Sequence, residues 1–166
     1  MGPVLLCYDG SDDAAVAIQS VARMLGPRSA VVLTVWERVA VWQPSDPATA
    51  LTAPLSELAS RALGLDEISA DVARKQVEHG LELARAAGFT AQSRIAQGKS
   101  WRVICEIGDE LEAEAIVVGA RGLSRVQSAL LGSVSAAVVQ HARRPVLVVP
   151  HNAERPGETG RFQTPS

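Results

Sequence analysis

The sequence lacks a membrane-spanning stretch, an export signal and a disulfide framework. No apolar run reaches the roughly eighteen residues that a transmembrane helix needs. The N-terminus enters a short apolar segment without a preceding cationic region or cleavage site, which argues against export. Cys7 and Cys105 are the only 2 cysteines, and both lie in apolar stretches. We therefore expect a cytoplasmic protein that spans no membrane and keeps both cysteines as reduced core residues.

Strong charge and the best-known catalytic motifs are also missing. The net charge is -2 and charged residues make up 20% of the chain, with no basic stripe of the kind that nucleic-acid binding requires. The three histidines are scattered, with no cysteine or carboxylate at metal-ligand spacing, so we expect no structural zinc and assign no metal ligand. A serine nucleophile elbow is absent, and so is the phosphate-binding loop that ends in lysine and serine or threonine. We therefore predict no catalytic residue, and we do not expect the protein to be a dedicated enzyme.

What the sequence does contain is a regular alternation of apolar runs and amphipathic segments. The first run ends at Asp9-Gly10-Ser11, as expected for a strand buried on both faces, and Ser11 is a suitable N-cap for the helix that follows. Strands that alternate with helices must be parallel and joined by crossover helices. We expect an α/β fold: a doubly wound, open, parallel five-stranded sheet of the Rossmann-like type, with strand order 3-2-1-4-5. The predicted strands lie near 4–8, 30–36, 90–96, 115–118 and 145–149.

We place a single domain at residues 1–150. Two further segments, one inside the domain and one after it, have no strong strand or helix pattern throughout. Residues 39–60 hold three prolines among small polar residues, and they predict a long surface loop that runs into a short helix near 55–63. Residues 151–166 are rich in proline and glycine with little to bury, and they predict a disordered C-terminal tail.

Two turn sequences are expected to meet where the winding of such a sheet reverses, since ligands bind there in open parallel sheets. One is Asp9-Gly10-Ser11, and the other is Gly119-Ala120-Arg121-Gly122 after the fourth strand. Further on, Gly132-Ser133 begins a helix, whose free N–H groups and dipole attract phosphate. A glycine lets the backbone come close to a ligand, and the hydroxyls of Ser133 and Ser135 could add hydrogen bonds to the same phosphate oxygens.

The spacing of these glycines resembles that of the ATP-binding members of the universal stress protein family. Two residues separate Gly119 from Gly122, and nine separate Gly122 from the Gly132-Ser133 pair, as in that family's motif. The apolar strand ending in Asp9-Gly10-Ser11 and the closing segment 145–149 are similar as well, so the resemblance covers about residues 4–149. One departure is Gly98-Lys99-Ser100, where the family often has a proline in the third position. We expect Ser100 to cap the next helix instead.

The resemblance implies that the cofactor is ATP, with Mg²⁺, and it assigns roles by position. Asp9 and Val35 would contact the adenosine, and Gly119 and Gly122 would lie close to the ribose and phosphates. The triphosphate would be held by Gly132, Ser133, Val134 and Ser135, with Arg121 and Arg125 helping to neutralise it.

The resemblance also implies a homodimer joined through the fifth strand at Val146, Leu147 and Val148, and a downstream protein partner whose identity the sequence does not indicate. Each residue has a plainer alternative. Glycines at strand–helix turns are common for steric reasons, Asp9 could simply form a turn, and Ser133 and Ser135 could cap a helix. At the level of the whole protein, the alternatives are an interaction dimer that binds no nucleotide and a slow ATPase.

Overall fold

The structure is a computed structural model that describes residues 2–37, 64–120 and 131–150. The predicted loop and short helix between 39 and 63, the connection that contains Arg121, Gly122 and Arg125, and the tail from 151 lie outside these residues. The described elements are β1 (Val4–Cys7), α1 (Asp12–Leu25), β2 (Ser29–Trp36), α3 (Leu65–Ala86), β3 (Thr90–Gln97), α4 (Ser100–Glu110), β4 (Ala115–Gly119), α5 (Ser133–His141) and β5 (Val146–Val149).

The strands form one parallel sheet in the order β3-β2-β1-β4-β5, which confirms the predicted fold class and strand order. β1 is central, and Val4 pairs with Ala30 of β2 on one side and with Ala115 of β4 on the other. The chain adds β2 and β3 on one side of β1 and then crosses over to add β4 and β5 on the other. The winding therefore reverses between β1 and β4.

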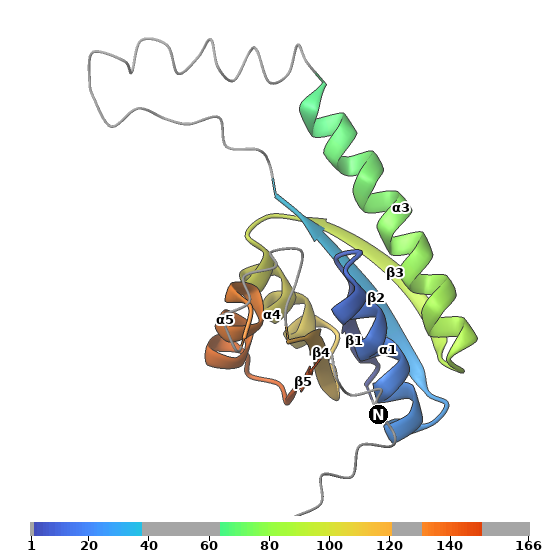
Figure 1. Cartoon of the computed structure of the whole chain (residues 1–166). Helices are drawn as coiled ribbons and strands as arrows, with labels where there is room; N and C mark the ends of the chain where they lie inside the picture. The colour runs from blue at the N-terminus through green and yellow to red at the C-terminus, as the bar shows by residue number, and fades with distance from the viewer. Residues whose placement is uncertain (1, 38–63, 121–130, 151–166) are drawn as a thin grey trace, which may run out of the picture.

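Alternation along β1 explains why helices cover both faces of the sheet. Val4 and Leu6 belong to a core cluster shared with α1 and α3, whereas Leu5 belongs to a second cluster shared with α4 and α5. All three side chains are fully buried. Figure 1 shows α1 and α3 on one side of the sheet and α4 and α5 on the other. The apolar run of β1 is thus continuous because both of its faces are covered.

The turn from β1 into α1 has the predicted capping. The Ser11 hydroxyl oxygen accepts a hydrogen bond from the Ala14 N–H at 3.2 Å, and Asp12 and Asp13 lie in the first turn, where the helix dipole favours negative charge. Gly26 ends the helix at φ 68°, in the left-handed region that glycine tolerates.

The start of α4 differs from the prediction that Ser100 caps it. Lys99 occupies the N-cap position without a side-chain bond, and Ser100 is the first helical residue. The cap comes from Glu37, whose Oε1 accepts from the Ser100 N–H at 2.8 Å and from its hydroxyl at 2.9 Å. Since β2 and β3 are in register up to Trp36 and Gln97, the residue after β2 lies beside the turn after β3. A carboxylate at this point also complements the helix dipole.

Candidate functional site

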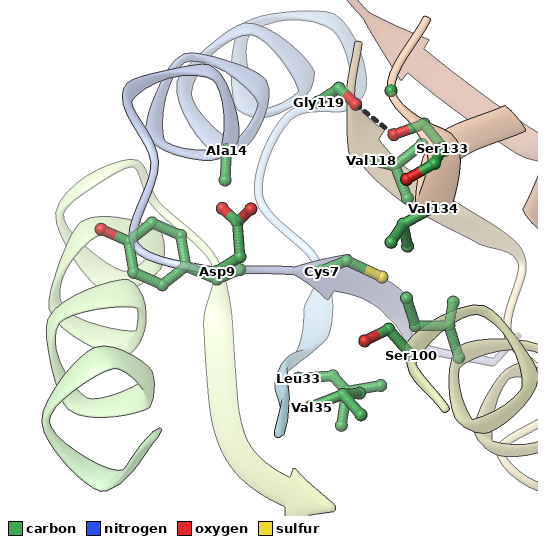
Figure 2. A pocket seen from close by; sticks show the side chains of 14 residues that line it. Cys7, Asp9, Ala14, Leu33, Val35, Ser100, Val118, Gly119, Ser133 and Val134 are labelled. Carbon is green, nitrogen blue, oxygen red and sulfur yellow. Dashed lines mark hydrogen bonds between the residues drawn. The ribbon is translucent and has the colours of Figure 1, made fainter. Parts of the chain in front are cut away.

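A cavity of about 330 Å³ opens at the carboxyl ends of the strands, where the winding reverses. Figure 2 shows its lining side chains, which come from β1, β2 and β4 and from the starts of α1, α4 and α5. The lining residues are Cys7, Tyr8, Asp9, Ala14, Leu33, Val35, Ser100, Ile104, Val118, Gly119, Gly132, Ser133, Val134 and Ser135.

One end of the cavity is the first turn of α5. Gly132 is the N-cap at φ -65° and ψ 153°, and its carbonyl accepts the first helical bond from Ala136 N–H at 2.8 Å. The N–H groups of Ser133, Val134 and Ser135 precede that bond, and no side chain caps the helix. Amides in the first turn of a helix have no partner within it. Together with the helix dipole, they make this end of the cavity attractive to anions.

The two serines of this turn differ in their surroundings. Ser135 is 6% exposed, and its hydroxyl donates to the carbonyl oxygen of Gly119 at 2.7 Å. The hydroxyl proton of Ser135 is therefore already held in a hydrogen bond to the backbone, drawn as the dashed line at Gly119 in Figure 2. The Ser133 side chain is exposed, so its hydroxyl is accessible to a ligand. We therefore expect Ser133, rather than Ser135, to supply a hydroxyl proton to a bound anion.

Gly119 has a steric role, which was the plainer alternative given for it in the sequence, and the structure identifies the atoms that it approaches. A Cβ built on this residue would lie 2.9 Å from the Asp13 carbonyl carbon and 3.1 Å from the Ala14 nitrogen. The missing side chain therefore lets the end of β4 press against the first turn of α1, which brings two walls of the cavity together.

Asp9 forms the turn between β1 and α1. Its Oδ1 accepts from the Ser11 N–H at 3.0 Å and from the Ser11 hydroxyl, and its carbonyl oxygen accepts from the side-chain amide of Gln76 at 3.0 Å. These bonds fix the carboxylate at the cavity wall, where Figure 2 shows it directed toward Ala14. The turn-forming alternative is therefore observed, and the same carboxylate also lines the cavity.

Across from the first turn of α5, the cavity wall is mostly apolar: Figure 2 shows Leu33 and Val35 on that side, with the Ser100 hydroxyl as its polar group and the Cys7 thiol nearby. Burial raises the pKa of Cys7 far above its ordinary value, and the charges of Cys105 and Asp9 act in the same direction. Cys7 is therefore kept as a neutral thiol. The neighbouring Tyr8 is 3% exposed, and its hydroxyl is 2.7 Å from Nδ1 of His79 on α3. Burial is the main reason why the pKa of Tyr8 is raised.

Most residues predicted for the site do line this cavity. These are Asp9, Val35, Gly119, Gly132, Ser133, Val134 and Ser135, whereas Arg121 and Gly122 lie outside the described residues. Sequence reasoning missed Cys7 and Leu33, which alternation along their strands could have indicated. It also missed Ser100, which enters the cavity wall only through the pairing of β2 with β3.

The described residues thus define an α/β domain with a cavity at the switch point of its sheet, polar at a helix N-terminus and mostly apolar at the other end. The chain belongs to the universal stress protein family, because the sequence model of that family matches residues 1–150. It is 34% identical over 100 residues to universal stress protein G of Salmonella typhimurium, covering 54% of this chain and 70% of that protein. It is 37% identical over 67 residues to a universal stress protein A-like protein of Arabidopsis thaliana, covering 40% of this chain but only 38% of that relative's length.

Solved structures of the family have the same fold. The universal stress protein UspA from Lactobacillus plantarum superimposes with a TM-score of 0.65 at 24% identity, over 89% of this chain and 97% of that one. A universal stress protein crystallised in complex with cAMP gives a TM-score of 0.59 at 25% identity, over 90% of this chain and 97% of the other.

Two further observations concern the described residues as a whole. None of their helices combines the length and apolar character needed to cross a bilayer. Within the same residues, histidine, cysteine and carboxylate side chains do not gather in threes as a metal site would require.

Proposed function

We propose that this protein binds ATP in the cavity between β1 and β4 and acts as a nucleotide-dependent regulatory binding protein in the stress response. The observation that carries the proposal is the polarity of the cavity. Its α5 end presents first-turn amides to an anion, and its Val35 end presents apolar side chains to a flat ring. A volume of about 330 Å³ lies within the usual range for small-molecule sites.

The comparison with a cAMP-bound member supports an adenine nucleotide as the ligand, since cAMP and ATP share adenosine. A triphosphate suits the amides of Ser133, Val134 and Ser135 because they offer several donors within one helical turn. Asp9 supplies the carboxylate among the described lining residues, and it would be the protein group nearest a cation. Mg²⁺ would then be held mainly by phosphate oxygens and water, as is usual for this ion.

The proposed role is binding rather than turnover. Asp9 already accepts two hydrogen bonds from Ser11, so it is engaged in forming the turn and is poorly placed to act as a general base. Occupancy would be passed to a protein partner through the connection from Gly119 to Gly132, because both of its ends line the cavity. We further propose a cytoplasmic homodimer joined through β5, whose residues Val146, Leu147 and Val148 are only half-buried at the sheet edge.

Isothermal titration calorimetry with MgATP tests the binding proposal. We expect saturable one-site binding at sub-millimolar ATP, and mass spectrometry of the natively purified protein should identify a co-purifying adenine nucleotide. Absence of binding at millimolar ATP would favour the nucleotide-free interaction dimer. Multiple turnovers of radiolabelled ATP within minutes would favour the ATPase.

Gly132→Val is the matched variant for this titration. Its backbone, at φ -65° and ψ 153°, suits a β-branched residue, so unfolding without nucleotide should change little. The added side chain at the helix start would keep phosphate from the first-turn amides, and ATP binding should be lost. Gly122→Val is expected to act in the same way on sequence grounds. If both variants bound ATP as the wild type does, the assigned phosphate site would be wrong.

A further inference from the structure

The hydroxyl of Ser100 has a fixed direction of hydrogen bonding. It donates its proton to Oε1 of Glu37 at 2.9 Å, and the same oxygen accepts from the Ser100 N–H at 2.8 Å. A serine hydroxyl has one proton and two lone pairs. Once the proton is held by a carboxylate, the oxygen can only accept from any other group. Glu37 thus turns Ser100 into a hydrogen-bond acceptor.

Ser100 is also part of the cavity wall, whereas Glu37 is not among the lining residues. Figure 2 shows the Ser100 hydroxyl on the side of the cavity where Leu33 and Val35 lie, across from Ser133 and Gly119. The other described side chains around this end are apolar or a neutral thiol. The Ser100–Glu37 pair is open to solvent and Ser100 is half-buried, so we expect the acceptor to distinguish a donor from another acceptor by the modest free energy of one solvent-exposed hydrogen bond.

We propose that Ser100, oriented by Glu37, selects a 6-amino purine over a 6-keto purine. The inference rests on the proposed function, since phosphates at the α5 amides place the base toward the apolar end. The amino group of adenine would donate to Ser100 Oγ. The keto oxygen of hypoxanthine or guanine would meet the same lone pairs and be repelled. Ser100 is therefore a specificity-determining residue, and Glu37 is a positioning residue that acts through it.

The proposal requires a particular difference between two substitutions. Ser100→Ala removes the acceptor, so discrimination falls mainly because ATP binds less well. Glu37→Ala keeps the hydroxyl but frees its proton, and the hydroxyl can then rotate to donate to a keto oxygen. In that variant discrimination falls mainly because the keto nucleotide binds better. A purely structural role for the Glu37 cap would weaken both nucleotides together.

The experiment compares ATP with inosine triphosphate by calorimetry on the full chain. The base of inosine triphosphate carries a keto oxygen at position 6 in place of the amino group, and a proton on N1. For the wild type we expect ATP to bind roughly threefold to tenfold more tightly than inosine triphosphate, as for one hydrogen bond that is partly open to solvent. The ratio should fall to near one in Ser100→Ala and in Glu37→Ala. It should persist in Ser100→Thr, which retains the hydroxyl, and in Ser93→Ala, an exposed serine of β3.

Because the readout is a ratio within each variant, a loss of folded protein affects both nucleotides equally. Wild-type protein that binds ATP with a ratio left unchanged by Ser100→Ala would overturn this inference and leave the proposed function intact. A ratio lost in Ser100→Ala but retained in Glu37→Ala would overturn the positioning role of Glu37. Wild-type protein that binds neither nucleotide would overturn the proposed function itself, and this inference with it.

Discussion

The Ser135 hydroxyl lies 2.7 Å from the Gly119 carbonyl oxygen and donates a buried hydrogen bond to it. This bond joins the first turn of α5 to the last residue of β4, the two elements between which the chain makes its glycine-rich connection. Both residues line the cavity, so the bond fixes the distance between the first turn of α5, which forms the polar end of the cavity, and the end of β4. It gives Ser135 a structural role that is distinct from the ligand role proposed for Ser133.

Ser135→Ala should therefore destabilise the fold. The substitution leaves the Gly119 carbonyl without its side-chain partner in a buried position, at a cost of about 1–3 kcal/mol of unfolding free energy. Urea denaturation without nucleotide measures the loss. Ser133→Ala is the matched control, because that side chain is exposed and makes no capping bond. The control should unfold as the wild type does and lose only ATP affinity, and equal destabilisation of both variants would contradict the distinction between the serines.

Gly119→Ala should also be destabilising, for a steric reason. The new Cβ would lie 2.9 Å from the Asp13 carbonyl carbon and 3.0 Å from its oxygen. These are backbone atoms of α1, which cannot rotate away as a flexible side chain can. We expect a loss of about 1–3 kcal/mol, typical of overpacking, measured by the same urea denaturation.

Since α1 must shift to make room, ATP affinity should fall with stability in Gly119→Ala. Gly132→Val provides the contrast, because it is expected to lose ATP binding with stability preserved. Wild-type stability in Gly119→Ala would show that β4 and α1 are not in close contact in solution.

The sequence was sufficient to predict the architecture and most of the cavity, and the residues show why. Continuous apolar runs such as β1 identify strands covered on both faces, and the glycine spacing located the turns at which the cavity opens. Three contacts could be found only in the structure. The contact of Glu37 with Ser100 depends on the register of β2 and β3, and that of Gly119 with Asp13 depends on the packing of α1 against β4. The bond from the Ser135 hydroxyl to the Gly119 carbonyl oxygen depends on how α5 lies against the end of β4. Each depends on residues far apart in sequence.

Alkylation of the two cysteines offers a test of the cavity that needs no substitution. Burial raises the pKa of both the Cys7 and Cys105 thiols, which lowers the reactive thiolate fraction at any given pH. Both should react slowly with iodoacetamide at pH 8 and faster as the pH rises. Saturating ATP should slow the modification of Cys7 further and leave Cys105 unchanged, because only Cys7 lines the cavity.

Peptide mass spectrometry over time measures both cysteines in one sample, so Cys105 acts as an internal control. Protection of both cysteines would indicate that ATP reduces the unfolding of the whole domain and does not act at the cavity alone. Protection of neither, with ATP shown to be bound, would place the nucleotide outside this cavity.

The exposed edge of β5 allows the proposed dimer to be tested without disturbing the sheet. The carbonyl oxygen of Pro145 accepts from the N–H of Ile116 in β4, and that of Val149 accepts from the N–H of Ala120 directly after β4, at 2.8 Å in each case. Residues alternate in a parallel strand, so the N–H of Val148 faces the open edge rather than β4. Val148→Pro removes that outward donor and leaves the bonds to β4 in place, as proline permits at a sheet edge. If two copies pair through β5, the substitution should give a monomer in sedimentation equilibrium. Val148→Ile, which keeps the N–H, should remain a dimer, and a dimer that survives Val148→Pro would have to be built on another surface.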